Sequence, residues 1–295
     1  MSQYVEYRRR RMGEAKRGES HYTPVMLVMY FVLAFGITWA ILIPALANVP
    51  EDQQILFIVL AAFGPFLSAV ITIWAGRGRS ELRRWLRQIF KLRIPAVLYL
   101  AGAFLLPIAI GVLQYGLYRV LGGEPGFSDA IPWYQYLAYL IPTALLSGGN
   151  EEPGWRGVAL PALLQWFHPV LVALILGVIH AAWHLPLMQH YETTFGWYVF
   201  NVVPLTFMLN WFYLRSRESV VPVMLLHAGT NVIGGFLPTP MDVLGGLGTY
   251  MVLRGVVYWA IAIVLIIGTR RRLGCNSEDG TGGRQGAGAV ACKGF

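Results

Sequence analysis

Residues 147–161 read SGGNEEPGWRGVALP and lie between two long apolar runs. The chain of 295 residues is 56% hydrophobic and 13% charged, whereas soluble domains carry roughly 25% charged residues. Two adjacent carboxylates, Glu151 and Glu152, with Arg156 four positions later, therefore stand in an apolar setting. Ionisable side chains at membrane depth are costly and usually mark functional sites. We interpret the chain as one helical membrane bundle with a buried polar centre.

The apolar runs predict an all-α fold, a polytopic membrane helix bundle of about eight transmembrane helices around a polar cavity, because a bilayer core needs about 20 apolar residues per helix. The expected spans are 25–47, 55–75, 94–121, 133–146, 170–188, 195–214, 220–237 and 250–268. The expected organisation is a basic N-terminal segment over 1–24, a transmembrane domain over 25–272 with its motif core at 147–231, and a disordered Gly-rich tail over 273–295.

The basic residues lie in short segments between the apolar runs, although the net charge is +8. This distribution argues against nucleic acid as a partner and favours the positive-inside pattern of membrane proteins. The basic segments are 8–17, 77–93, 215–217 and 270–293, and they fall on one side if there are eight spans. We expect an integral membrane protein of the plasma (cell) membrane with both termini in the cytoplasm.

The two adjacent glutamates should contact different residues. Glu152 and Arg156 are four apart and share one helical face, where they can pair. Glu151 is rotated about 100° from Glu152 and points elsewhere. Asn150 is expected to cap the helix, and Pro153 suits its first turn. The alternative is an interfacial helix with acidic residues at its positive end and no further role.

Two more polar clusters lie in later spans. His180 and His184 share a face, a spacing that is half of an HExxH zinc motif, but no glutamate follows the first histidine. His227 and Asn231 share a face of the seventh span, and the alternative is that they only join helices. A bundle could bring all three clusters around one pocket. Arg254, in the eighth span, has no role that its pattern defines.

These residues, in this order, resemble the CAAX prenyl protease and bacteriocin-processing family of intramembrane proteases, also called the CPBP or Abi family. Its three motifs are Glu-Glu-x-x-x-Arg, aromatic-x-x-x-His and His-x-x-x-Asn. The matching residues are, in order, Glu151, Glu152, Arg156, His184, His227 and Asn231. His180 occupies the aromatic position, a departure that leaves open whether it adds a ligand or fills the place of a ring.

The resemblance implies a helical bundle whose polar cavity opens to the cytoplasmic side, and it implies peptide-bond hydrolysis. Eukaryotic relatives remove the last three residues from a prenylated C-terminus, while bacterial relatives are linked to bacteriocin maturation or self-immunity. The expected activity is therefore CAAX-type intramembrane endopeptidase. The expected partners are a peptide or protein substrate, prenylated or otherwise membrane-associated, and the lipid bilayer.

Hydrolysis needs an activated water, a stabilised oxyanion and a protonated leaving amine. In the expected catalytic set, Glu151 is the base, His184 holds the water, and His227 with Asn231 donates to the oxyanion. The supporting residues are Glu152, Arg156 and His180. Either there is no cofactor, or Glu151, His184 and His227 hold Zn²⁺. The sequence leaves both versions open, with a slight preference for the metal-free one.

Two other classes of function use the same buried residues. A membrane transporter could employ them as an ion or proton site, but the chain shows no inverted repeat. A non-catalytic immunity or scaffold protein could retain the fold without the chemistry. All motif residues are present, which favours the enzyme.

Overall fold

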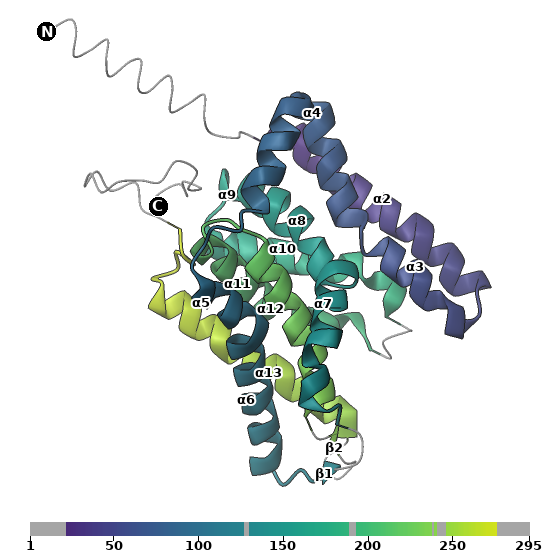
Figure 1. Ribbon diagram of the computed structural model, residues 1–295, viewed down its shortest axis with the longest axis vertical. Helices are drawn as coiled ribbons and strands as arrows, with labels where there is room; N and C mark the ends of the chain where they lie inside the picture. The colour runs from purple at the N-terminus through teal and green to yellow at the C-terminus, as the bar shows by residue number, and fades with distance from the viewer. Residues whose placement is uncertain (1–21, 127–129, 189–192, 238, 241–245, 276–295) are drawn as a thin grey trace, which may run out of the picture.

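The computed structural model describes residues 22–126, 130–188, 193–237, 239–240 and 246–275. Most of these residues are helical, which confirms the all-α bundle (Figure 1). Two short strands, β1 (Pro125–Gly126) and β2 (Thr239–Pro240), pair antiparallel at the end of the bundle next to α6 and α13. The predictions for residues 1–21 and 276–295 lie outside the described residues.

The helices follow the apolar runs of the sequence. In chain order the helices and helical turns are α2 (Pro24–Asn48), η1 (Glu51–Gln53), α3 (Gln54–Ala61), α4 (Gly64–Ile89), α5 (Ala96–Leu100), η2 (Ala101–Leu105), α6 (Leu106–Val120), η3 (Trp133–Gln135), α7 (Tyr136–Leu146), η4 (Gly149–Glu151), α8 (Glu152–Gly154), η5 (Trp155–Ala159), α9 (Leu160–Leu164), α10 (Pro169–Trp183), η6 (Leu185–Leu187), α11 (Phe195–Arg215), α12 (Val221–Val232), η7 (Ile233–Phe236) and α13 (Gly246–Gly268). Two of these turns, η2 and η5, are π-helical.

Four helical segments of the described chain are long and apolar enough to cross a membrane. They are Pro24–Asn48, Glu51–Ile89, Ala96–Val120 and Met251–Gly268. Two shorter apolar helices, Pro169–Trp183 and Val221–Phe236, lie among them. The protein is therefore an integral membrane protein with a polytopic helical fold, while the expected number of eight spans stays a prediction.

The basic segment 77–93 is more than a link between two apolar runs, because α4 continues through most of it as a helix. The chain reverses at Gly78, whose φ of 82° lies in the left-handed region that favours glycine. After the reversal, Trp85 and Ile89 are buried at helical spacing, and basic residues cover the other face. Figure 1 shows α4 turning back at the top of the view, with α2 beside it.

Two of the basic segments, 77–93 and 215–217, lie close together at one end of the bundle, and Tyr22 lies beside the first of them. The guanidinium carbon of Arg77 lies 4.1 Å from the centre of the Tyr22 ring, which joins 77–93 to the start of α2. The Ser219 hydroxyl donates to the carbonyl of Lys91 at 2.8 Å, which joins it to the end of α11. This arrangement supports the expectation that they share one side, and which side they face stays a prediction.

The motif-bearing stretch from η4 to α9 passes through the middle of the bundle. At Gly154 the chain comes so close to α4 that a Cβ atom would lie 2.4 Å from the Pro65 carbonyl oxygen. Glycine is therefore required at this crossing. Trp155 and Arg156, which follow, are fully buried. The first motif thus lies in the protein core, beside α4 and α12.

Candidate active site

The polar motif begins with a tight turn rather than with the expected helix cap. The Asn150 side-chain oxygen accepts from the Gly148 backbone N–H at 3.0 Å, so it is not free to cap α8. The reason is the 3₁₀ turn η4, which precedes α8 and places Glu151 at its start. The expectation that Asn150 caps the helix was wrong, whereas Pro153 does lie in the first turn.

Glu152 is fully buried and has two partners. Its Oε1 accepts from Arg156 Nη1 at 3.0 Å, which confirms the expected i, i+4 pair. The same oxygen lies 2.6 Å from His227 Nδ1 on α12. Because this oxygen already accepts from the Arg156 guanidinium, His227 donates its Nδ1 proton to it. Glu152 therefore connects the first motif to the third.

Glu151 points to different partners, as the sequence predicts. Its Oε2 lies 2.9 Å from His180 Nε2 on α10. The Trp155 indole N–H donates to the same oxygen at 3.3 Å. Trp155 was missed in the sequence, although its spacing from Glu151 is the same as that of Arg156 from Glu152. The two adjacent carboxylates thus have separate sets of contacts.

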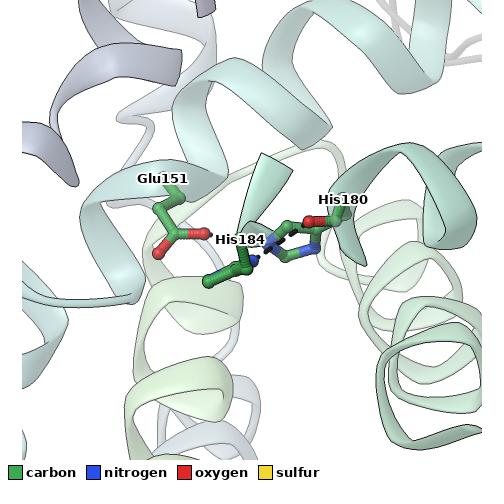
Figure 2. Close-up of side chains that lie close together, drawn as sticks. All are labelled: Glu151, His180 and His184. Atoms are coloured by element: carbon green, nitrogen blue, oxygen red, sulfur yellow. Dashed lines mark hydrogen bonds and ion pairs between the residues drawn. The ribbon is translucent and has the colours of Figure 1, made fainter. Parts of the chain in front are cut away.

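His184 follows α10 directly and has a defined tautomer. Its Nδ1 lies 3.0 Å from the backbone carbonyl oxygen of His180. A carbonyl oxygen only accepts hydrogen bonds, so Nδ1 carries the proton and Nε2 keeps its lone pair. Figure 2 shows Glu151 and the two imidazole rings close together, with His184 bonded back to His180. One ligand atom from each of the three side chains lies within 4.8 Å of the others.

His227 and Asn231 face the same turn of backbone. A Cβ atom at Gly148 would lie 2.6 Å from Asn231 Nδ2 and 3.5 Å from His227 Nε2. Gly148 has a φ of 116°, which disfavours any other residue there. Asn231 is exposed whereas His227 is buried, so this part of the site opens outward. The third motif is thereby brought next to the first.

The cluster that could hold a metal ion is Glu151, His180 and His184. It differs from the expected set by one member, because His180 takes the place of His227. Two histidines and one carboxylate suit Zn²⁺, and the His184 tautomer fits a ligand. His180 Nδ1, however, is buried without a hydrogen-bond partner. A ligating imidazole normally donates its second N–H, so the cluster fits zinc incompletely.

Arg254 has a structural contact instead of a place in the cluster. Its Nε donates to the Asn201 side-chain oxygen at 3.3 Å. This bond joins α13 to α11, which pack along much of their length. The residue therefore stabilises the packing of these two helices.

Residues 132–233 match the family model described as "Type II CAAX prenyl endopeptidase Rce1-like". No curated protein matches the chain. The matched segment contains all three motifs, and outside it lie α2 to α6 and α13. The match supports a CAAX-type intramembrane endopeptidase in general. The resemblance to the CAAX protease family is thereby confirmed, and the segment that carries Glu151, His184, His227 and Asn231 is Rce1-like.

Proposed function

We propose that this protein is an intramembrane endopeptidase of the CAAX type in which Glu151 activates the hydrolytic water without a metal ion. The family match supports the general activity. The observation that carries the finer proposal is the separation of the two carboxylates. Glu152 is held by Arg156 and His227, whereas Glu151 faces the histidines of α10.

The base is Glu151. Its Oε2 accepts from two donors, Trp155 Nε1 and His180 Nε2, which fix the orientation of the carboxylate. Its other oxygen, Oε1, is the one to receive a proton from water. His184 Nε2 has a lone pair and accepts the second hydrogen bond from the same water. The water oxygen is then directed at the substrate carbonyl carbon.

The oxyanion forms when the water oxygen bonds to that carbon and its proton moves to Glu151. Asn231 Nδ2 and His227 Nε2 are the donors proposed for the negative oxygen. Glu152 favours the doubly protonated His227, the form in which Nε2 can donate. When the C–N bond breaks, Glu151 returns the proton to the leaving amine, which balances the reaction.

The contacts of His180 support the metal-free version. If Nε2 held a metal, Nδ1 would carry a proton buried without an acceptor, which costs about 1–3 kcal/mol. Without a metal, Nε2 donates to Glu151 and Nδ1 has only an unused lone pair. No step of the proposed mechanism passes through a metal ion.

The substrate is a protein or peptide that reaches the site from the membrane, because the site lies within an integral membrane bundle. We propose a prenylated C-terminus as the preferred substrate, in line with the family description. A transporter is less favoured, because its ion site would have to share side chains that are already paired with one another.

The test uses the full chain purified in detergent, with prenylated and unprenylated peptides of the same sequence. Cleavage should be faster for the prenylated peptide and should persist after chelation, and the metal content should stay well below one ion per chain. Stoichiometric zinc whose removal abolishes activity, and whose return restores it, contradicts the metal-free mechanism. A folded protein that cleaves neither peptide contradicts the endopeptidase.

A further inference from the structure

A proline distorts the helix that carries the first motif. Pro161 has no N–H, so the Gly157 carbonyl lacks its usual α-helical donor, and the proline ring would collide with that carbonyl. The helix responds with the π-turn η5, in which the Leu160 N–H bonds to the Trp155 carbonyl five residues back. Such turns insert one extra residue and are frequent at functional sites.

The Gly157 carbonyl receives two donors from elsewhere in the chain. The Trp85 indole N–H donates to it at 2.8 Å, and the Tyr22 hydroxyl donates at 3.2 Å. Both side chains are buried. A Cβ atom at 157 would lie 3.1 Å from Trp85 Cζ2, so glycine lets the indole approach this closely. We call Tyr22, Trp85 and the Gly157 carbonyl the carbonyl clamp.

The clamped turn carries the contacts of both carboxylates. Trp155 and Arg156, its first two residues, bond to Glu151 and Glu152 respectively. A shift of η5 would therefore move the donors of the proposed base and of its neighbour together. Displacements of about 1 Å in an active site can cost roughly a hundredfold in rate.

We propose that Tyr22 and Trp85 are positioning residues, which hold η5 through the Gly157 carbonyl and so fix the orientation of Glu151 and Glu152. The proposal rests on the endopeptidase activity for its kinetic effect. Both donors lie outside residues 132–233, because Tyr22 precedes α2 and Trp85 lies in the returning arm of α4. The N-terminal part of the chain thus contributes to the geometry of the site.

The test removes the donors and keeps an aromatic side chain at each position, with Trp85→Phe, Tyr22→Phe and the double variant. Tyr136→Phe is the matched control, because the Tyr136 hydroxyl donates to the Ala103 carbonyl in the other π-turn at 2.7 Å. Two quantities are measured on the full chain in detergent. One is kcat and KM on a peptide substrate, and the other is amide hydrogen exchange over 155–162 and 101–107.

For Trp85→Phe we expect kcat to fall about tenfold with little change in KM, and exchange over 155–162 to accelerate. Tyr22→Phe should act in the same direction more weakly, because its bond is longer. Tyr136→Phe should accelerate exchange over 101–107 alone and leave kcat unchanged. Unchanged exchange over 155–162 in Trp85→Phe overturns the clamp.

Two further outcomes are decisive. Equal losses of kcat in Trp85→Phe and Tyr136→Phe overturn the positioning role, because any lost buried hydrogen bond would then suffice. If the wild-type protein cleaves no peptide, the endopeptidase fails, and the exchange measurement still decides whether the clamp holds η5.

Discussion

The two π-turns of this protein, η2 and η5, are built in the same way. In each, a proline lies four residues after a residue in the middle of the turn, Pro107 after Ala103 and Pro161 after Gly157. In each, aromatic donors from elsewhere bond to the carbonyl that the proline leaves without an α-helical partner. The shared construction shows that a π-turn with a donor is a way of accommodating proline in a buried helix.

The turns differ in what they carry. The sequence of η2 is AGAFL, without an ionisable side chain, and the turn packs against α12. The sequence of η5 is WRGVA, and its first two residues contact the adjacent carboxylates. Its carbonyl also has two donors instead of one. A π-turn by itself therefore does not indicate function. The charged side chains whose positions depend on the turn do indicate it.

The largest effect is expected for Glu151→Gln, which keeps the size of the side chain and removes the base. The protein should stay folded and membrane-inserted, while activity falls at least ~100-fold, the lower end of what proton transfer supplies. The measurements are cleavage rate and thermal stability in detergent. Near-normal cleavage by Glu151→Gln, together with a stable but inactive Glu152→Gln, would reverse the roles of the two residues.

A smaller loss of activity, about tenfold, is expected for Glu152→Gln, with a clear loss of stability. Arg156 and His227 both depend on this carboxylate in a buried place, and breaking a buried pair costs about 3–5 kcal/mol in soluble proteins. Thermal unfolding and kcat are compared with those of Glu151→Gln. If both variants remain fully active, the hydrolase interpretation fails, and a transporter or scaffold replaces it.

The smallest difference concerns one glycine at each π-turn, Gly154 directly before η5 and Gly102 inside η2. A Cβ atom would lie 2.4 Å from the Pro65 carbonyl oxygen at Gly154 and 2.4 Å from the Pro222 carbonyl oxygen at Gly102. Gly154→Ala and Gly102→Ala should therefore destabilise the protein similarly, by about 1–3 kcal/mol. At a temperature where both variants are folded, only Gly154→Ala should also lower kcat, by several-fold. Equal kinetic losses would remove the distinction between the turns.

Much of the bundle could be predicted from the sequence, because lipid-length apolar runs are a strong local signal. The pairing of Glu152 with Arg156 was also predictable from a local signal, because helical spacing alone brings the two side chains together. The divergence of Glu151 from its neighbour also follows from the geometry of a helix. Both features depend on residues within five positions of one another.

The features of the fold and of the site that could not be predicted depend on contacts between segments far apart in the sequence. The spacing of His227 from Asn231 gives no indication that Nδ1 of the former bonds to Glu152, 75 residues away. The helical spacing of Trp85 and Ile89 after Gly78 is hard to recognise within a run of basic residues. The contact between His180 and Glu151 depends on how α10 packs against the first motif, which local spacing does not define.

The carbonyl clamp has a consequence for how the protein is made. A chain grows from its N-terminus, so Tyr22 and Trp85 are synthesised well before Gly157. The donors can therefore be present before the distorted helix that needs them enters the bundle. A fragment that begins at residue 132 would contain every motif of the family and would still leave a buried carbonyl without its side-chain donors. Expression of the matched segment alone would thus yield the chemistry-bearing residues without the scaffold that aligns them.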